Sequence, residues 1–392
     1  MTNTYALNAG SYISVVTQGP DGAIWSTDFT AGMITRIDTS GGISNCPTSP
    51  GSRLLGETFG PDGNLWYLDN GRNVVAKMIP STCAITEYSV GDRFVGLWSI
   101  ISVNGSLWFT EYAPRYNAIV RMTTDGAMTS YPIPTPSAYT FYITPGPDGN
   151  LWFTENAAQQ VAKLDPNSGQ ITEYPVPGSG LGVQALVTGP DNNLWILANT
   201  AQYGYVLKFS TTGTLLAKYA AQFETLLNIV VGSDGALWFP QYYPNGVGRI
   251  TTAGVVSTVP LISPNALSNS VAIGSDGKLW VAETNAGAFG RLSAIGGTGG
   301  TIQATHGVPF DGAVASFVDG TPTAQSTNFT ATITWGDGTG GPGTVSGPAG
   351  GPFTVSGMHT YTSPGSYSLN VSLHDNVDNA TYQASSGGAQ VN

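Results

Sequence analysis

The sequence contains little charge. Only 9% of its 392 residues are Asp, Glu, Lys or Arg, whereas about 25% is usual in soluble domains. The net charge is −11, and neither Lys nor Arg occurs after Arg291. Because binding to nucleic acid requires a positively charged surface, we expect no nucleic-acid partner.

Long apolar runs, histidine and cysteine are scarce as well. No run of eighteen apolar residues occurs, so we expect no membrane-spanning helix. The three histidines and two cysteines lack the spacing of a zinc site. Cys46 and Cys83 form either one disulfide between the outer parts of adjacent repeats or two unpaired thiols, and the sequence leaves both alternatives open.

Turn-forming residues take the place of the missing charge. The chain has 52 Gly and 25 Pro, and 41% of its residues are apolar, which favours an all-β protein with frequent turns. Met1 leads directly into a polar, strand-like segment, so we expect a signal peptide to have been removed from this chain. The low charge and the Thr, Ser and Gly content suggest a bacterial protein that is secreted or held at the cell surface.

One short motif recurs seven times, in forms such as GPDGNLW, GSDGALW and VNGSLW. Successive copies end in tryptophans spaced 41, 42, 44, 43, 43 and 42 residues apart. These tryptophans are Trp25, Trp66, Trp108, Trp152, Trp195, Trp238 and Trp280. Repeats of this length, each rich in short strands, are typical of a propeller with one four-stranded blade per repeat. We therefore predict an all-β fold with a seven-bladed β-propeller over residues 1–295.

The seventh repeat lacks a fourth strand of its own. Tyr5 lies 20 residues before Trp25, much as Tyr88 and Tyr131 lie 20 and 21 residues before the tryptophans that follow them. The N-terminal segment is therefore predicted to supply the outer strand of blade seven and to close the ring.

Basic residues recur at one position, 11 to 13 residues after each tryptophan. They are Arg36, Lys77, Arg121, Lys163, Lys208, Arg249 and Arg291. A functional cationic ring is one interpretation. We prefer a repeated structural role, in which each residue pairs with acceptors of the adjacent blade.

The repeat stops before a second domain. Residues 296–301 are rich in glycine and are predicted to be a flexible linker. From 302 to 392, strand-like runs alternate with Gly/Pro turns, which is typical of a β-sandwich. The stretches WGDGT from Trp335, HTY from His359 and GSY from Gly365 resemble PKD-type immunoglobulin-like domains, and this resemblance implies an exported spacer or adhesion module.

The candidate site is predicted at the end of each hairpin opposite its Gly-Pro-Asp-Gly turn. The residues three after and eleven before each tryptophan are expected to be neighbours there, around one mouth of the channel. The first set includes the candidate ligand-binding residues Asp28, Asp69, Glu111, Glu155, Gln241 and Glu283, with Ala198 as the exception; the second set is Ser14, Leu55, Leu97, Phe141, Gln184, Leu227 and Asn269. Two aromatic residues beside the second set, Trp98 and Tyr142, complete the candidate ligand-binding residues. An acidic, partly aromatic mouth suits a cation, a sugar or a peptide, while the alternative is that the acids cap strand ends.

The seven GPDGNLWFTE-like repeats over about residues 3–295 are similar to the virginiamycin B lyase (streptogramin lyase) family. This resemblance implies a seven-bladed propeller that opens a cyclic depsipeptide by elimination, with a His base, acidic residues and Mg²⁺. Glu283 matches the family's catalytic Glu, whereas Asn269 stands where the family has its His. An asparagine cannot act as a general base near neutral pH.

These observations favour an exported or cell-surface binding or structural protein, with an acidic propeller mouth and the sandwich as spacer or docking module. Its partner is expected to be a small molecule, a glycan or a protein, and no cofactor or metal is expected. One alternative is a carbon–oxygen lyase acting on a depsipeptide, lactone or polysaccharide, with Glu283 as its catalytic residue and with Mg²⁺. A second alternative is a self-assembling surface-layer or filament subunit.

Overall fold

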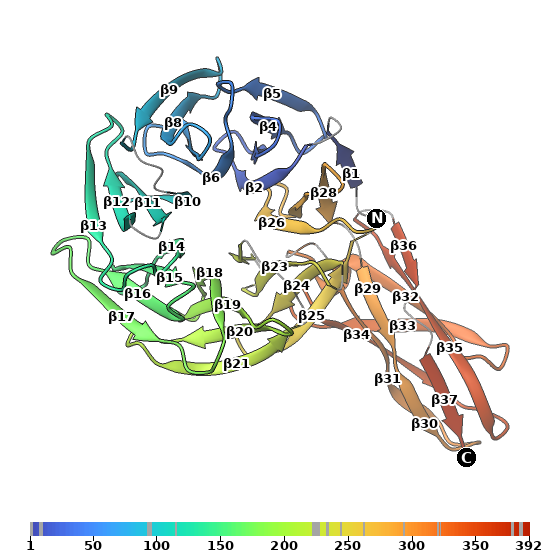
Figure 1. Ribbon diagram of the computed structural model, residues 1–392. Helices are drawn as coiled ribbons and strands as arrows, with labels where there is room; N and C mark the ends of the chain where they lie inside the picture. The colour runs from blue at the N-terminus through green and yellow to red at the C-terminus, as the bar shows by residue number, and fades with distance from the viewer. Residues whose placement is uncertain are drawn as a thin grey trace.

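In a computed structural model of the chain, seven four-stranded antiparallel sheets surround a central channel (Figure 1). The structure describes residues 3–7, 11–91, 96–113, 116–221, 228–232, 235–243, 245–261, 263–292, 295–319, 321, 323–377, 380–383 and 387–392. This arrangement confirms the all-β fold and the seven-bladed propeller. Within the described residues, no helix has the length and apolar character needed to cross a membrane.

The first four blades follow one another along the chain. Blade 1 contains β2 (Ile13–Gln18), β3 (Ile24–Asp28), β4 (Met33–Ile37) and β5 (Ile43–Pro47). Blade 2 contains β6 (Leu54–Phe59), β7 (Leu65–Asp69), β8 (Val74–Ile79) and β9 (Ala84–Ser89). Blade 3 contains β10 (Leu97–Val103), β11 (Ser106–Ala113), β12 (Tyr116–Met122) and β13 (Met128–Pro132). Blade 4 contains β14 (Thr140–Pro145), β15 (Leu151–Glu155), β16 (Gln160–Leu164) and β17 (Ile171–Pro175).

The remaining blades complete the ring. Blade 5 contains β18 (Gly182–Thr188), β19 (Leu194–Asn199), β20 (Gly204–Phe209) and β21 (Leu215–Ala221). Blade 6 contains β22 (Val230–Val231), β23 (Leu237–Gln241), β24 (Gly246–Ile250) and β25 (Val256–Pro260). Blade 7 contains β26 (Ser268–Ile273), β27 (Leu279–Glu283), β28 (Ala288–Leu292) and, from the other end of the chain, β1 (Asn3–Ala6). Strand β1 pairs with β28 from Asn3 opposite Arg291 to Ala6 opposite Ala288, so the first strand of the chain closes the ring.

Each repeat tryptophan lies in a polar and aromatic cage, as Trp152 illustrates. Its indole Nε1 donates to Asp148 of the turn at 3.0 Å, and its ring stacks on Tyr174 at a centroid distance of 5.5 Å. The ammonium group of Lys163 lies 5.4 Å from the ring centroid. Gly213 of the next blade packs against Tyr174, where an added Cβ would lie 2.0 Å from the ring, so the cage also connects adjacent blades.

The basic position is therefore structural, but its partner differs from the prediction. Lys163 and Lys208 each form an ion pair with the turn aspartate of their own repeat, at 3.5 and 2.8 Å. Arg36 and Arg291 do the same, with N–O distances of 2.6 and 2.7 Å. These acceptors lie in the same blade, but Lys208 also donates to the Thr252 carbonyl of blade 6 at 3.3 Å, so for this residue the predicted contact with the adjacent blade forms as well.

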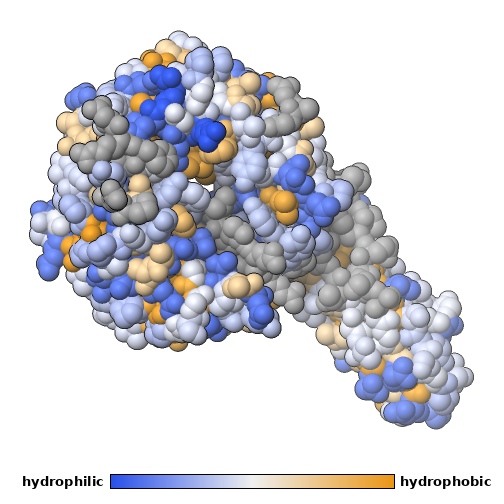
Figure 2. All heavy atoms as spheres, viewed as in Figure 1, coloured by the Kyte–Doolittle hydropathy of each residue, from blue (hydrophilic) through white to orange (hydrophobic). Residues whose placement is uncertain are grey.

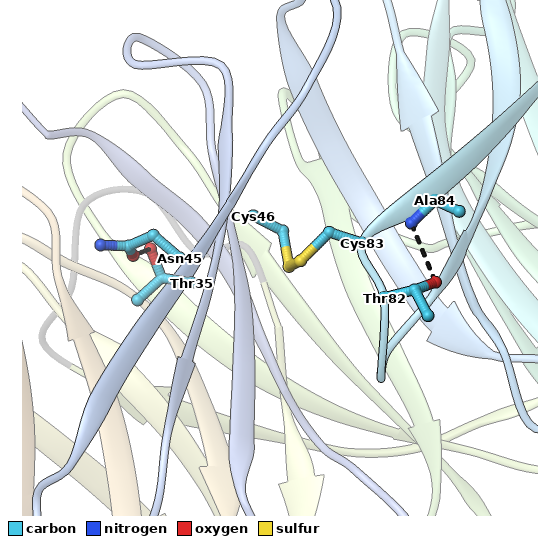
Figure 3. The surroundings of a disulfide bond; sticks show 6 residues. All are labelled: Thr35, Asn45, Cys46, Thr82, Cys83 and Ala84. Carbon is cyan, nitrogen blue, oxygen red and sulfur yellow. Dashed lines mark hydrogen bonds between the residues drawn. A yellow bond between two sulfur atoms is a disulfide. The ribbon is translucent and has the colours of Figure 1, made fainter.

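Cys46 and Cys83 form a disulfide between blades 1 and 2 (Figure 3). Cys46 lies on β5 and Cys83 immediately precedes β9, with their Cα atoms 5.5 Å apart. The bond crosses an interface that is otherwise held by apolar packing around Trp25, Leu54 and Met78. Of the two alternatives left open by the sequence, the structure has the disulfide.

Removing this disulfide should lower the free energy of unfolding by about 3 kcal/mol, because the unfolded chain regains the entropy of a long open loop. The residues it joins are 37 apart in the sequence. Guanidinium unfolding of the wild type and of the Cys46→Ala/Cys83→Ala double variant measures the difference. If both thiols of the unreduced, denatured wild type react with a maleimide, the bond does not form and the expected difference disappears.

Residues after the propeller form a separate all-β module. Its strands are β29 (Ile295–Gly299), β30 (Thr301–Ala304), β31 (Phe310–Asp319), β32 (Phe329–Thr334), β33 (Gly340–Ser346), β34 (Phe353–His359), β35 (Gly365–Asp375), β36 (Ala380–Gln383) and β37 (Gly387–Val391), with the short 3-10 helix η1 (Ser326–Asn328). Because β33 pairs with both β32 and β34, the strands join into one sheet that folds round a single core including Trp335, Phe353 and Tyr361.

The predicted glycine-rich linker is not a free segment. Residues Ile295–Gly299 form β29, which pairs with β31 over five residue pairs. The backbone hydrogen bonds of this ladder hold a glycine-rich stretch that side chains alone would leave loose. Val318 of β31 also packs with Val247 and Val259 of blade 6, so the module contacts the propeller, beside β25 in Figure 1.

Candidate functional site

A β-bulge in the innermost strand shifts the predicted pairing by one residue in five blades. Asp28 lies opposite Ile13 and Glu283 lies opposite Ser268, which are twelve residues before their tryptophans, whereas Leu97 lies opposite Glu111 as predicted. The same shift pairs Asp69 with Leu54, Glu155 with Thr140 and Ala198 with Val183. The residue eleven before tryptophan sits inside the bulge, because an extra residue on one strand has no partner on the other. Leu227, the equivalent in blade 6, lies outside the described residues.

The bulge also creates a contact between blades. The carbonyl groups of Leu55, Phe141 and Gln184 accept hydrogen bonds from Thr27, Thr110 and Thr154 of the preceding blade, at 2.8, 3.0 and 2.8 Å. Each donor stands two residues after its tryptophan. These bonds fix the innermost strands around the channel.

Asp28 and Asp69 are buried and act on the backbone. The Asp28 carboxylate accepts from the N–H groups of Tyr12, Thr30 and Ala31 at 3.1, 2.9 and 2.8 Å. The Asp69 carboxylate accepts from the N–H groups of Arg53, Gly71 and Arg72 at 2.9, 2.9 and 3.2 Å. The two acids therefore cap strand ends, and each fixes the backbone of a residue thirteen before its tryptophan.

Of the other predicted acids, Glu111 is half-buried, whereas Glu155 and Glu283 are buried. Glu155 and Glu283 are fully buried, and within the described residues their carboxyl oxygens make no hydrogen bond of normal geometry. Burial raises the pKa of Glu111 to about 7, and burial together with the nearby Glu173 raises the pKa of Glu155 to about 8. Burial also raises the pKa of Glu283, against the opposing effect of the Ser263 hydroxyl. Gln241 is buried as well, with 1% of its surface exposed.

The mouth is consequently not an acidic ring. A Cβ added at Gly290 would lie 2.5 Å from a carboxyl oxygen of Glu283, so that side chain follows the blade toward β28 and away from the channel. Side chains alternate direction along a strand, and the position three after tryptophan falls on the face between blades. The predicted acids Asp28, Asp69, Glu155 and Glu283 are thus buried and do not line the cavity.

The open site is a cavity of about 780 Å³ over blades 1 to 3 that extends to Tyr142 of blade 4. Its lining residues are Tyr12, Ser14, Val15, Phe29, Thr30, Gly51, Arg53, Leu55, Gly56, Asn70, Gly71, Trp98, Tyr112 and Tyr142. Figure 2, in the same view as Figure 1, shows the ring centre hollowed between hydrophilic and hydrophobic side chains. Of the predicted ligand-binding residues, Trp98 and Tyr142 line this cavity.

Aromatic rings dominate one wall of the cavity. Trp98 stacks on Phe141 at 4.6 Å and meets the edge of Tyr112 at 5.6 Å. Tyr12 meets Phe29 edge-on at 6.1 Å on the other side. Rings that support each other in this way keep their faces in place for a ligand.

Sequence reasoning missed Tyr12, Phe29, Arg53 and Tyr112. For Phe29 and Tyr112 the signal was present one position further along. The residues four after each tryptophan are Phe29, Asn70, Tyr112, Asn156, Asn199, Tyr242 and Thr284. In this set Asn70, Asn156 and Thr284 bond to the backbone of the next blade, while the aromatic members Phe29, Tyr112 and Tyr242 line cavities. The aromatic residues at this position therefore indicate the cavity lining better than the acids do.

A smaller cavity of about 290 Å³ adjoins the first one. It lies over blades 6, 7 and 1 and is lined by residues that include Tyr242, Thr284 and Asn285. Tyr12 and Thr30 line both cavities. Together the two spaces cross the mouth from blade 6 to blade 3.

Asn269 is held between two tyrosines. Its amide Nδ2 donates to the Tyr12 hydroxyl at 3.2 Å, and its Oδ1 accepts from the Tyr242 hydroxyl. Asn269 has only 1% of its surface exposed. The residue at the position where the resemblance implies a base therefore has both ends of its side chain engaged by the protein.

The residues present do not fit the Mg²⁺ that the resemblance implies. Mg²⁺ prefers carboxylate and water oxygens in octahedral geometry, but Glu283 points toward Gly290 and the Asn269 oxygen is already bonded. Across the described residues, no group of three or more His, Cys, Asp or Glu side chains comes together.

A further buried acid lies in the wall of blade 2. Glu57 occupies a position that is Val16, Ile143, Leu186 or Val271 in other blades, and it lies opposite Tyr67 with 6% of its surface exposed. Burial raises its pKa well above the usual range. The acid departs from an apolar repeat position, which is the signal that would have found it.

Comparisons with known proteins identify the family to which this chain belongs. The family model of the virginiamycin B lyases matches residues 1–114, 48–220 and 208–332. A search of curated proteins finds no match.

Among solved structures, a catalytically inactive His-to-Ala variant of virginiamycin B lyase from Staphylococcus aureus with quinupristin is 26% identical, with a TM-score of 0.67, and covers 74% of this chain and 98% of that chain. A streptogramin B lyase structure is 26% identical, with a TM-score of 0.66 over 74% and 96%. The extracellular domain of a putative one-component system from B. thetaiotaomicron is 12% identical, with a TM-score of 0.58 over 100% and 58%, and shares the fold. The chain belongs to the virginiamycin B lyase family.

Proposed function

We propose that this chain is a glycan-binding protein of the cell exterior, in which the aromatic cavity at the propeller mouth holds the sugar rings. The observation that carries the proposal is the cavity of about 780 Å³ with Tyr12, Trp98 and Tyr112 around it. Aromatic faces stack on the C–H faces of sugars, and the hydroxyl groups of Tyr12 and Thr30 supply polar partners. A concave, largely apolar site with a few polar groups is the usual form of a small-ligand site.

The disulfide supports a location at the cell exterior. Disulfides form and persist in oxidising compartments outside the cytosol, and the bond between Cys46 and Cys83 joins two blades of this protein. The WGDGT and HTY stretches support a PKD-type spacer or docking role for residues 302–392. There Asp337 accepts from His359 at 2.7 Å and the His359 ring stacks on Trp335, so these motif residues support one another's positions.

The lyase alternative is weaker for a chemical reason. Elimination requires a group that removes a proton, and a side-chain amide cannot do this near neutral pH. In the Staphylococcus aureus enzyme, a His-to-Ala variant is described as catalytically inactive. Here Asn269 stands at the position that the resemblance gives to the base, and its amide is bonded to Tyr12 and Tyr242.

A glycan array tests the proposed function. We expect the wild type to bind at least one class of immobilised glycan, and Trp98→Ala to weaken that binding by about 100-fold, because loss of a stacked aromatic anchor typically costs a few kcal/mol. Trp98→Phe, which keeps a ring, serves as the matched variant and should retain much of the affinity. If no neutral or acidic glycan is retained, or if Trp98→Ala binds as the wild type does, the proposal is wrong.

The wild-type protein also tests the lyase alternative. Incubation with a streptogramin B and Mg²⁺, followed by mass spectrometry, should leave the ring intact. Ring opening that Glu283→Gln abolishes would establish the lyase instead.

A further inference from the structure

We propose that the mouth cavity selects acidic glycans, with Arg53 binding the carboxylate of a uronic acid while the aromatic wall holds the sugar rings. This inference rests on the proposed function and names the class of glycan. It predicts an anion-selective site on a protein whose net charge is −11.

The charge of the cavity lining is the first observation that supports an acidic ligand. Among the described residues that line it, Arg53 is the one ionised side chain, and the others are aromatic, aliphatic, hydroxyl, amide or glycine residues. Of the acids that the sequence placed at this mouth, Asp28, Asp69, Glu155 and Glu283 are buried, and the half-buried Glu111 is not among the residues that line the cavity. From the described lining residues a ligand therefore meets one positive charge, and an anionic group on the ligand complements it.

Arg53 differs from Arg36, Arg72 and Arg291, which are paired with carboxylates. Arg36 and Arg291 bond to turn aspartates at 2.6 and 2.7 Å, and Arg72 bonds to Glu87 at 2.8 Å. The Arg53 guanidinium carbon lies 6.0 Å from the Phe29 ring centroid, and among the described residues no carboxylate lies within ion-pairing distance of it. Its charge is available to a ligand.

Arg53 is also held in position through its backbone. Its N–H donates to the buried Asp69 carboxylate at 2.9 Å, and Asp69 accepts two further N–H groups from the following turn. Asp69 is thus a positioning residue for Arg53, as Asp28 is for Tyr12. The bonded backbone fixes where the Arg53 side chain begins, and the guanidinium lies near the Phe29 ring at the cavity lining.

The guanidinium group of Arg53 is suited to a carboxylate ligand. Guanidinium binds a carboxylate through two parallel hydrogen bonds, which adds both energy and orientation. A uronic acid carries its carboxylate on the sugar ring, so stacking near Phe29 and bonding to Arg53 place the two contacts on the same residue of the glycan. Because the second cavity shares Tyr12 and Thr30 with the first, an oligosaccharide has space for further rings across the mouth.

Titration calorimetry with tetragalacturonic acid and its fully methyl-esterified form tests the inference. The two ligands have the same rings and linkages and differ in charge. We expect the wild type to bind the acid at least about 10-fold more tightly than the ester, because a charge-assisted bidentate pair is lost in the ester. This preference should shrink as salt is raised, since Arg53 is exposed.

Variants assign the preference to one residue. Arg53→Gln should bind the acid and the ester equally, with its affinity for the ester unchanged, and Arg53→Lys should retain part of the preference. Lys218→Gln, which removes an exposed positive charge from the outer strand β21, should behave as the wild type. Circular dichroism checks that each variant is folded.

The calorimetry tests the preference for acidic glycans, and the glycan array tests the glycan-binding function on which that inference rests. Equal wild-type affinity for acid and ester, a preference that survives Arg53→Gln, or no binding of either ligand each overturns the acidic-glycan assignment. The glycan array judges the proposed function separately, because neutral glycans retained through Trp98 would support that function even after the acidic assignment has failed.

Discussion

Replacing Trp152 with alanine is expected to lower the free energy of unfolding by about 3 to 5 kcal/mol. Trp152 is fully buried and packs against Val183 and Phe209 of blade 5. The substitution also removes the ring that stacks on Tyr174 and leaves Asp148 without its indole donor. The loss therefore combines a cavity between blades with one hydrogen bond fewer to Asp148, which keeps Asn150 and Lys163 as partners.

Denaturant unfolding, followed by circular dichroism, measures this effect. The matched control is Tyr203→Ala, which removes an aromatic ring that is 64% exposed and should change stability by less than about 1 kcal/mol. If Trp152→Ala is no more destabilising than Tyr203→Ala, the interblade role of the repeat tryptophan is refuted.

Replacing Glu155 with glutamine should stabilise the protein above pH 8 by several kcal/mol and leave its stability near pH 4 almost unchanged. Burial and the neighbouring Glu173 raise the pKa of Glu155 from 4.5 in an exposed setting to about 8 in the folded protein. Between these values the unfolded chain releases a proton that the folded protein retains, so stability falls as pH rises from about 4.5 to 8. Each tenfold change in the ionisation constant is worth about 1.4 kcal/mol.

Denaturant unfolding at a series of pH values from 4 to 9 tests both the sign and the size of the change in the free energy of unfolding. Glu87→Gln is the opposite control, because Arg72 and Ser49 hydrogen-bond to the Glu87 carboxylate and its pKa is lowered. That variant should lose stability above the usual pKa of a glutamate. A Glu155→Gln variant with the same pH dependence as the wild type would show that Glu155 is ionised in the folded protein.

The role of Trp152 could be predicted from the sequence, whereas the burial of Glu155 could not. The tryptophan and the basic residue recur in all seven copies and the turn aspartate in six, so their shared structural role can be predicted by comparing the copies. The burial of Glu155 could not be predicted in this way. Its position carries Asp, Glu, Gln or Ala in the seven repeats, and a polar residue at a strand end ordinarily reads as exposed.

The candidate site shows the same division. The sequence places Trp98 and Tyr142 at the mouth because they lie beside the residues eleven before tryptophan, and both line the cavity. Arg53 and Tyr12 were missed, since each lies before the innermost strand in a stretch that varies among repeats. Their positions come from hydrogen bonds of their N–H groups to Asp69 and Asp28, which leave no mark on composition or periodicity.

The sequence by itself determined the architecture. Seven tryptophans at 41- to 44-residue spacing define seven similar units, and each unit buries its apolar strands only against its neighbours, so repetition in the chain becomes repetition in space. The tertiary structure alone decided which side chains face the channel. One bulged residue in the innermost strand changes the register, and a one-residue change turns a side chain to the opposite face. It also decided the contact of Asn269 with Tyr12, which lie 257 residues apart in the sequence and meet because the ring closes.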